Sequence, residues 1–241
     1  MTVLDVKGVS KRFGGLQALS DVTFSVGAGQ IVGLIGPNGA GKTTFFSALV
    51  GLIKPDRGTV TLAGRSMVGL KPHRVAAYGM TKTFQNVALF GESSVLDNVL
   101  TAGLLRHDVQ SARQAARRCL ERVGLLAVAD KQANTLSFPE RARVELARAL
   151  CTEPKVLLLD EVMAALNPVE MREIMDLIRS LRDDGITLLV VEHHMRAIMA
   201  ICDRILVLNF GKLLADGTPR EIASHPDVIE AYLGQSMEKH R

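Results

Sequence analysis

The sequence predicts an α/β fold with a mostly parallel sheet, an antiparallel β subdomain near its start and an inserted helical subdomain. Residues 31–63 and 155–241 alternate short apolar runs with helical segments, which is typical of parallel α/β sheets. Residues 1–30 alternate apolar and polar positions between glycine breaks, which indicates antiparallel strands. Residues 86–154 are rich in arginine and alanine and have helical periodicity, so they are assigned to the helical subdomain.

Local patterns predict the individual elements. Residues 31–35 form a continuous apolar run, which indicates a buried strand, and a helix is expected to follow at about 42–52. Further strands are expected at 59–63, 156–159 and 186–191, a hairpin at 205–208 and 212–215, and helices at 169–183 and 219–232.

Composition narrows the class of protein. The chain has 241 residues, of which 47% are hydrophobic, and this suits a sheet that is covered on both faces. No apolar run approaches the roughly 18 residues of a membrane-spanning helix, and the first residues lack a secretory signal pattern, so a cytosolic location is expected. The net charge of +4 and the absence of tryptophan do not favour a nucleic-acid partner.

The segment after the run at 31–35 matches a phosphate-binding loop. It reads Gly36-Pro37-Asn38-Gly39-Ala40-Gly41-Lys42-Thr43 and is followed by Thr44. This fits G-x-x-x-x-G-K-[ST] between a predicted strand and a predicted helix, where backbone N–H groups face an anion. Lys42 is expected to reach the β- and γ-phosphates, and Thr43 to bind Mg²⁺. Residues 36–44 are therefore predicted to bind MgATP in a P-loop NTPase core of RecA-like type.

Two later strands are predicted to end in polar residues beside this loop. The strand at 156–159 leads into Asp160 and Glu161, and the strand at 186–191 leads into Glu192-His193-His194. Ligands of open α/β sheets lie beyond the carboxyl ends of the strands. Asp160 is expected to hold Mg²⁺, Glu161 to orient and deprotonate the attacking water, and His193 to donate to the γ-phosphate. Glu161, His193 and Lys42 are thus the predicted catalytic residues.

Together these motifs resemble the nucleotide-binding subunit of ABC transporters, and the resemblance covers essentially the whole chain. It implies that Phe13 stacks on adenine and that Gln85 contacts Mg²⁺ and senses the membrane partner. It implies residues 1–85 and 155–241 as the ATP-binding core and 86–154 as the helical subdomain. It also implies permease subunits and a second ATP-binding subunit as partners, and a peripheral position on the cytoplasmic face of the cell membrane.

Four stretches are similar to the ATPases of branched-chain amino-acid importers within that family. They are 11–19 (KRFGGLQAL), 166–170 (LNPVE), 201–205 (ICDRI) and 231–234 (AYLG). Related ATPases that export lipopolysaccharide share parts of them, so this alternative stays open. Motion is expected to reach the membrane subunits through the helical region near residues 85–99. A ribosome-associated or nucleic-acid-bound member of the family is disfavoured, because the chain has no long insertion or second ATPase unit.

The chain departs from the family at its signature, which is usually L-S-G-G-Q. Here residues 136–140 read Leu-Ser-Phe-Pro-Glu. In the family the signature of each chain closes on the ATP of the other, and Ser137 matches the serine that contacts it. Pro139 has no N–H to donate, and Phe138 is bulky where close backbone approach is needed. Ser137-x-x-Glu140 is also a capping box, so Ser137 could instead cap its own helix.

This departure leads to a hypothesis of an unequal pair. The chain's own Lys42, Asp160, Glu161 and His193 are expected to be competent when a non-identical partner supplies an intact signature. The partner's ATP would then face Phe138 and Pro139 and turn over slowly. The alternative is a regulatory subunit with little hydrolysis of its own, which the intact acidic pair opposes.

Overall fold

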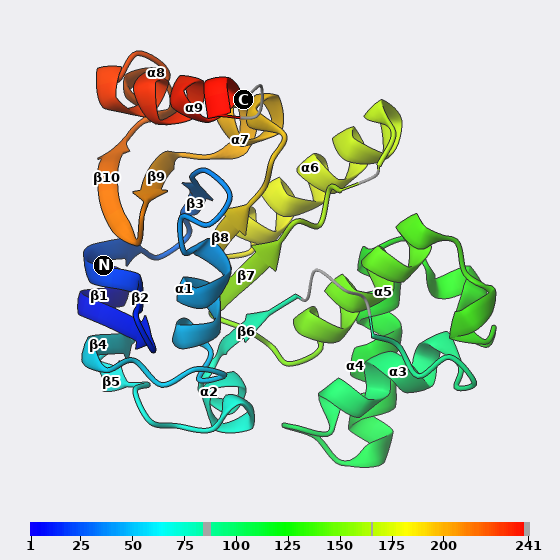
Figure 1. Cartoon of the computed structure of the whole chain (residues 1–241). Helices are drawn as coiled ribbons and strands as arrows, with labels where there is room; N and C mark the ends of the chain where they lie inside the picture. The colour runs from blue at the N-terminus through cyan, green and yellow to red at the C-terminus, as the bar shows by residue number, and fades with distance from the viewer. Residues whose placement is uncertain (84–87, 165, 239–241) are drawn as a thin grey trace.

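The computed structural model spans residues 1–241 and describes residues 1–83, 88–164 and 166–238. Its strands form two sheets (Figure 1). The smaller sheet is antiparallel, with the order β2-β1-β4-β5. Its strands are β1 (Thr2–Phe13), β2 (Leu16–Gly27), β4 (Arg57–Leu62) and β5 (Arg65–Ser66). The antiparallel pairing predicted for residues 1–30 is therefore present, and the strand expected at 59–63 joins the same sheet.

The larger sheet has six strands in the order β10-β9-β3-β8-β7-β6. Strands from β9 to β6 are parallel to their neighbours, and β10 returns antiparallel to β9. The strands are β3 (Ile31–Ile35), β6 (Met80–Lys82), β7 (Val156–Asp160), β8 (Thr187–Val191), β9 (Arg204–Asn209) and β10 (Lys212–Gly217). The order places β8 between β3 and β7, which brings the three predicted site segments to neighbouring strands.

Both faces of the larger sheet are buried, each in a different apolar core. Side chains of successive strand residues point to opposite faces and so enter the two cores in turn. Ile31, Leu157, Leu188 and Ile205 belong to one apolar core with the later helices, whereas Val32, Leu158, Leu189 and Leu206 belong to a second core. That second core holds the smaller sheet and the two phenylalanines of α1 (Lys42–Leu49). The continuous apolar runs of these strands follow from this double burial.

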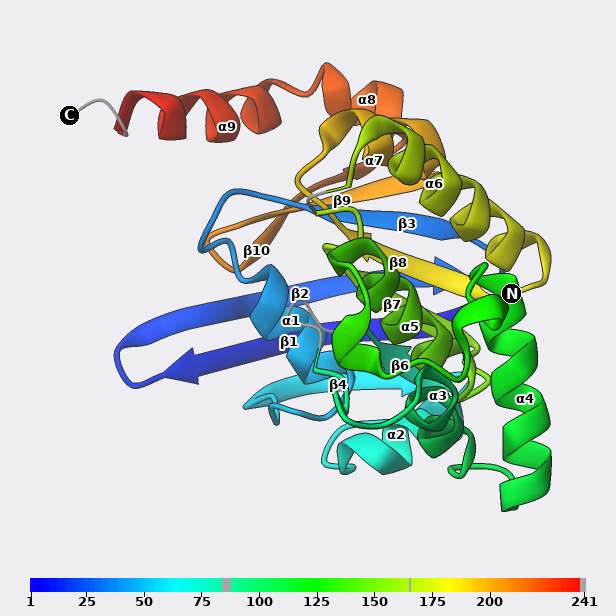
Figure 2. The ribbon, with the colours of Figure 1, turned by 90° about the vertical axis from the view of Figure 1, so that its right-hand side faces the viewer.

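The remaining helices cover the sheets or form a group of their own. Figure 1 shows α3, α4 and α5 set to one side of the sheets, and Figure 2 shows α9 reaching beyond them. The helices are α2 (Pro72–Tyr78), α3 (Val95–Gly103), α4 (Val109–Arg122), α5 (Phe138–Leu150), α6 (Pro168–Asp183), α7 (Met195–Ile201), α8 (Pro219–Ala223) and α9 (Pro226–Glu238). Short 3-10 turns lie at Leu126–Val128 and Ala133–Thr135.

Two helix predictions need correction. The helix after the phosphate-binding loop ends at Leu49 rather than near residue 52, and Gly51 beyond it has a positive φ of 77°. The tail expected as one helix at 219–232 is two helices, because Thr218 caps α8 and a new helix begins at Pro226. Proline is favoured in a first helical turn and ends the preceding helix. Among the described residues, no helix is both long enough and apolar enough to cross a membrane.

Candidate functional site

Three strand ends meet at one edge of the larger sheet. The loop 36–41 follows β3, Asp160 and Glu161 lie at the end of β7, and Glu192 and His193 follow β8. Because β3, β8 and β7 are adjacent and parallel, their carboxyl ends lie at the same edge. This is the edge at which open α/β sheets bind ligands. The structure therefore brings the predicted loop, acids and histidine together.

The loop after β3 is closely packed against two other segments. A Cβ on Gly36 would lie 2.1 Å from the carbonyl oxygen of Leu208, and one on Gly41 would lie 2.6 Å from that of Ala18. Only glycine fits at either position. Gly41, with φ 103°, precedes α1, whose start has no side-chain cap and no acidic residue in its first turn. The first N–H groups of α1 thus have the arrangement that binds phosphate.

Lys42 is buried inside this loop and stays close to its backbone. Its Nζ donates to the carbonyl oxygens of Gly36 at 2.6 Å and Pro37 at 3.1 Å. Burial lowers the pKa of Lys42, while the nearby charges of Glu161 and Asp160 act in the opposite direction. The ammonium group is therefore held at the loop, with both predicted acids near enough to affect its charge.

An open cavity of 580 Å³ lies over the loop. From the predicted set it is lined by Asn38, Gly39, Ala40, Gly41, Lys42, Thr43, Thr44, Glu161 and His193. It is also lined by Leu16, Gln17, Ala18 and Phe210, which sequence reasoning missed. These four come from the β1–β2 hairpin and the β9–β10 turn. A backbone hydrogen bond from the N–H of Ser20 to the carbonyl oxygen of Gly211 joins the two segments. No local pattern in the sequence marks that long-range contact.

Glu161 and His193 contact each other beyond the carboxyl ends of β7 and β8. Nε2 of His193 donates to Oε1 of Glu161 at a distance of 2.8 Å. Glu161 has a positive φ of 56°, a conformation that non-glycine residues adopt at a cost and that is concentrated at functional sites. The turn after β7 therefore holds this carboxylate beside His193, which follows the end of β8.

Asp160 is buried one residue earlier and is held from two sides. Its Oδ2 lies 3.1 Å from Nζ of Lys82, and its N–H donates to Oγ1 of Thr83 at 3.0 Å. Sequence reasoning did not single out Lys82, which lies at the end of the short strand β6. The carboxylate of Asp160 and the hydroxyl of Thr43 are oxygen donors of the kind that Mg²⁺ takes together with phosphate oxygens. Thr43 lines the cavity, whereas Asp160 is buried and is not among the lining residues. The residues present thus fit the metal that the motifs imply.

Comparison with known proteins decides the family. The profile of the family described as "ABC transporter" matches residues 19–164, and that of "Branched-chain amino acid ATP-binding cassette transporter" matches residues 212–237. The chain belongs to the ABC transporter family. It is therefore an ATPase, which binds ATP and couples ATP hydrolysis to transport.

Individual relatives of this ABC ATPase are similar over almost their full length. The high-affinity branched-chain amino acid transport ATP-binding protein LivG of Salmonella typhimurium is 45% identical, covering 97% of this chain and 98% of LivG. The lipopolysaccharide export system ATP-binding protein LptB of Acidithiobacillus ferridurans is 38% identical, covering 98% of each. A dimeric ATP-binding cassette solved in a post-hydrolysis state with ADP and phosphate has a TM-score of 0.81 and 27% identity, covering 90% of this chain and 99% of that one.

The signature segment of this ABC ATPase starts helix α5 as a capping box. Oε2 of Glu140 accepts from the Ser137 N–H at 2.8 Å and from its hydroxyl at 2.7 Å. These two bonds lower the pKa of Glu140, so the carboxylate is favoured. Phe138 is 50% exposed in the first turn, beside Pro139. The hydroxyl of Ser137 is thus used within its own helix, as the S-x-x-E spacing predicts.

Other predicted residues lie elsewhere or outside the described chain. Phe13 lies at the end of β1, with Nζ of Lys11 5.4 Å from its ring centroid, and it is not among the residues lining the cavity. Its stacking on adenine stays a prediction. Gln85, predicted to contact Mg²⁺, lies outside the described residues.

Glu192 is a site residue that sequence reasoning did not assign a role. Its buried Oε1 accepts from the N–H of Met163 at 2.6 Å, which ties the end of β8 to the turn that carries Glu161. Burial raises the pKa of Glu192 from 4.5 to about 7, with hydrogen bonds from Met163 and His193 opposing and the charges of Glu161 and Asp160 adding to the rise.

We expect Glu192→Gln to make the stability of the nucleotide-free chain less sensitive to pH. Because the folded pKa lies above the unfolded value, ionising Glu192 destabilises the fold as pH rises from 4.5 to 7. The variant should therefore gain up to about 3 kcal/mol in free energy of unfolding, relative to wild type, between pH 4.5 and pH 8. Urea unfolding at several pH values measures this. Glu230→Gln, at an exposed position of α9, is the control, and its free energy of unfolding relative to wild type should not change with pH. The prediction is contradicted if the same holds for Glu192→Gln.

Proposed function

We infer that this chain is the ATP-hydrolysing subunit of an ABC transporter that imports branched-chain amino acids. The 45% identity to LivG over nearly the whole chain and the C-terminal match at residues 212–237 support this substrate class. A lipopolysaccharide exporter is the second candidate, and the 38% identity to LptB favours it less. The observation that carries the ATPase function is the single cavity lined by the phosphate-binding loop, Glu161 and His193.

We propose roles for the predicted residues, several of which line this cavity. Backbone N–H groups of residues 36–44 bind the phosphates, and Lys42 neutralises the β- and γ-phosphates. Glu161 orients and deprotonates the attacking water, and His193 donates to the γ-phosphate in place of the bond that it makes to Glu161 in the nucleotide-free chain. Thr43 and Asp160, with Gln85, would hold Mg²⁺, which would supply neutralisation of charge on the phosphate oxygens. Lys82 keeps the buried Asp160 carboxylate oriented.

The chain's partners follow from the family. ABC ATPases form pairs and act with permeases, and we propose that this one binds permease subunits at the cytoplasmic face of the cell membrane. We further propose that residues 86–154 form the helical subdomain that carries the signature, and residues 1–85 and 155–241 the ATP-binding core. No nucleic acid is part of this proposal.

We propose that the two ATP sites formed by this chain and a second ATP-binding subunit differ in their rate of hydrolysis. The capping box at Ser137, the exposed Phe138 and the missing N–H of Pro139 support a weak signature that faces the partner's ATP. The intact Lys42, Asp160, Glu161 and His193 support a competent site in this chain, completed by a non-identical partner. A regulatory subunit without hydrolysis of its own is the alternative, and the Glu161–His193 pair argues against it.

The test is to purify the chain with its membrane subunits and reconstitute them in vesicles containing ATP. Uptake of labelled leucine, isoleucine or valine that stops in a Lys42→Ala variant is the expected result. Transport of lipopolysaccharide with no amino-acid uptake would support the second candidate instead. Uptake that continues in Lys42→Ala would contradict the assignment of the ATP site.

A further inference from the structure

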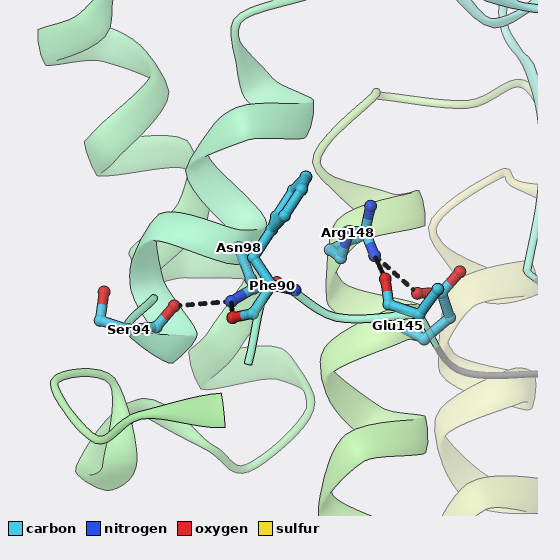
Figure 3. Close-up of polar contacts among 6 residues, drawn as sticks. Phe90, Ser94, Asn98, Glu145 and Arg148 are labelled. Carbon is cyan, nitrogen blue, oxygen red and sulfur yellow. Dashed lines mark hydrogen bonds and ion pairs between the residues drawn. The ribbon is translucent and has the colours of Figure 1, made fainter. Parts of the chain in front are cut away.

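The loop at residues 88–94 precedes α3 and is shaped by one buried amide. Asn98 of α3 is fully buried. Its Oδ1 accepts from the Phe90 N–H at 2.8 Å, and its Nδ2 donates to the carbonyl oxygens of Phe90 at 3.0 Å and Ser94 at 2.9 Å (Figure 3). Satisfying the amide in this way fixes the backbone on both sides of Phe90. The phenylalanine side chain is nevertheless 55% exposed.

A second side chain reaches the same loop from the signature helix. Nη1 of Arg148, near the end of α5, donates to the carbonyl oxygen of Ala88 at 2.8 Å and to Oε2 of Glu145 at 3.1 Å. The guanidinium carbon lies 5.9 Å from the centroid of the Phe90 ring. Figure 3 shows Arg148 between Phe90 and Glu145. Arg148 therefore joins loop 88–94 to α5 through a charge-assisted hydrogen bond and contact with an aromatic ring.

The segment that leads into the signature makes further bonds to the loop. The N–H of Asn134 donates to the carbonyl of Gly91, and that of Ala133 donates to the carbonyl of Ser93, both at 3.1 Å. Arg141 of α5 in turn donates to the carbonyl of Asn134 at 2.8 Å. In the part of the chain that the structure describes, the hydrogen bonds of residues 88–94 go to residues 90–148. The loop is thus attached to the helical subdomain at several points.

These contacts join the exposed Phe90 to the signature through one rigid element. Ser137 caps the start of α5 and Arg148 lies in its last turn, so the helix spans about 16 Å between them. A displacement of the signature on closure of the pair moves α5 as a unit. Asn98 of α3 and residues 133–134 hold the later part of the loop, whereas Arg148 bonds α5 directly to its first residue, Ala88.

We propose that Arg148 is a positioning residue that makes loop 88–94 move with α5, so that Phe90 transmits the position of the signature to the membrane subunits. This proposal rests on the proposed function for the identity of the partner. Arg148 does not line the ATP cavity. Its loss therefore removes the direct bond between α5 and the start of the loop without touching the residues that line the ATP cavity.

The first experiment needs no partner. Hydrogen exchange of the amides of residues 88–94 is measured in the isolated chain for wild type, Arg148→Met, Arg148→Lys and Arg117→Met. Methionine keeps the unbranched stem but cannot donate, so we expect about tenfold faster exchange, whereas lysine keeps a cationic donor and should stay within about threefold. Arg117, exposed on α4, is the matched control and should change nothing. Unchanged exchange in Arg148→Met would overturn the proposal.

The second experiment uses the chain together with the membrane subunits that co-purify with it. The stimulation of ATP hydrolysis by those subunits should fall about fivefold in Arg148→Met while the Kd for ATP stays within about twofold, and Arg148→Lys should retain most of it. Faster exchange with unchanged stimulation would overturn the coupling role. The stimulation of ATP hydrolysis does not depend on which molecule is transported. A failure of amino-acid uptake would therefore reject the substrate class without affecting the conclusion on Arg148.

Discussion

Glycine in place of Pro139 is expected to raise hydrolysis at the partner's site by about tenfold or more. Proline cannot donate the hydrogen bond that a glycine N–H in the signature gives to phosphate. A lost bond to a charged group costs about 1.5–3 kcal/mol, which corresponds to a factor of roughly ten to a hundred in rate. The measurement is phosphate release from the assembled pair, with this chain's own site silenced by Glu161→Gln so that only the partner's ATP is counted.

The matched control for Pro139→Gly is Pro219→Gly. Both prolines lie in the first turn of a helix whose start is capped by a serine or threonine with a glutamate three residues on. The loss of helix stability is therefore similar, about 1 kcal/mol or less in either case. An increase in hydrolysis with Pro219→Gly, or none with Pro139→Gly, would show that the missing N–H of Pro139 does not limit the partner's site.

Glutamine in place of Glu161 is expected to lower hydrolysis at this chain's own site by about a hundredfold or more while ATP binding is kept. A general base contributes that much to the rate, whereas the residues proposed to hold the phosphates, 36–44, are not touched by the substitution. The amide oxygen can still accept from Nε2 of His193, so the turn after β7 should keep its shape. Single-turnover hydrolysis and ATP binding to the assembled pair are the measurements.

The control for this substitution is Glu230→Gln, which removes an exposed carboxylate from α9. It should leave both ATP binding and hydrolysis unchanged. A Glu161→Gln variant that loses ATP binding as well would show that the carboxylate acts on the fold of the site, and one that keeps full hydrolysis would exclude Glu161 as the base.

The motif-bearing part of the site could be predicted because local geometry demands particular residues. Gly36 and Gly41 fit only without a Cβ, and Lys42 follows the second of them at a fixed spacing. The strand at 156–160 predicts where its acids lie, since the parallel sheet brings its end to the same edge as the loop. The capping box was likewise visible, because Ser137 and Glu140 are separated by one helical turn.

The rest of the site depends on contacts between distant segments, which a single sequence does not reveal. Phe210 reaches the cavity because the turn after β9 packs against β2, and Lys82 meets Asp160 across 78 positions of sequence. Glu192 lies next to a predicted residue, yet its role depends on a bond to Met163 in another turn. The break between α8 and α9 differs from these, because Pro226 marks it locally.

The unequal pair is tested most directly by silencing one site at a time in the assembled transporter. Phosphate release is measured with Glu161→Gln in this chain alone, and then with the equivalent substitution in its partner alone. The account predicts a loss of about ten- to a hundredfold in the first case, because only the partner's weakened site then releases phosphate, and less than about twofold in the second, because the weak signature at 136–140 already limits the partner's site. Equal losses in the two cases would contradict it.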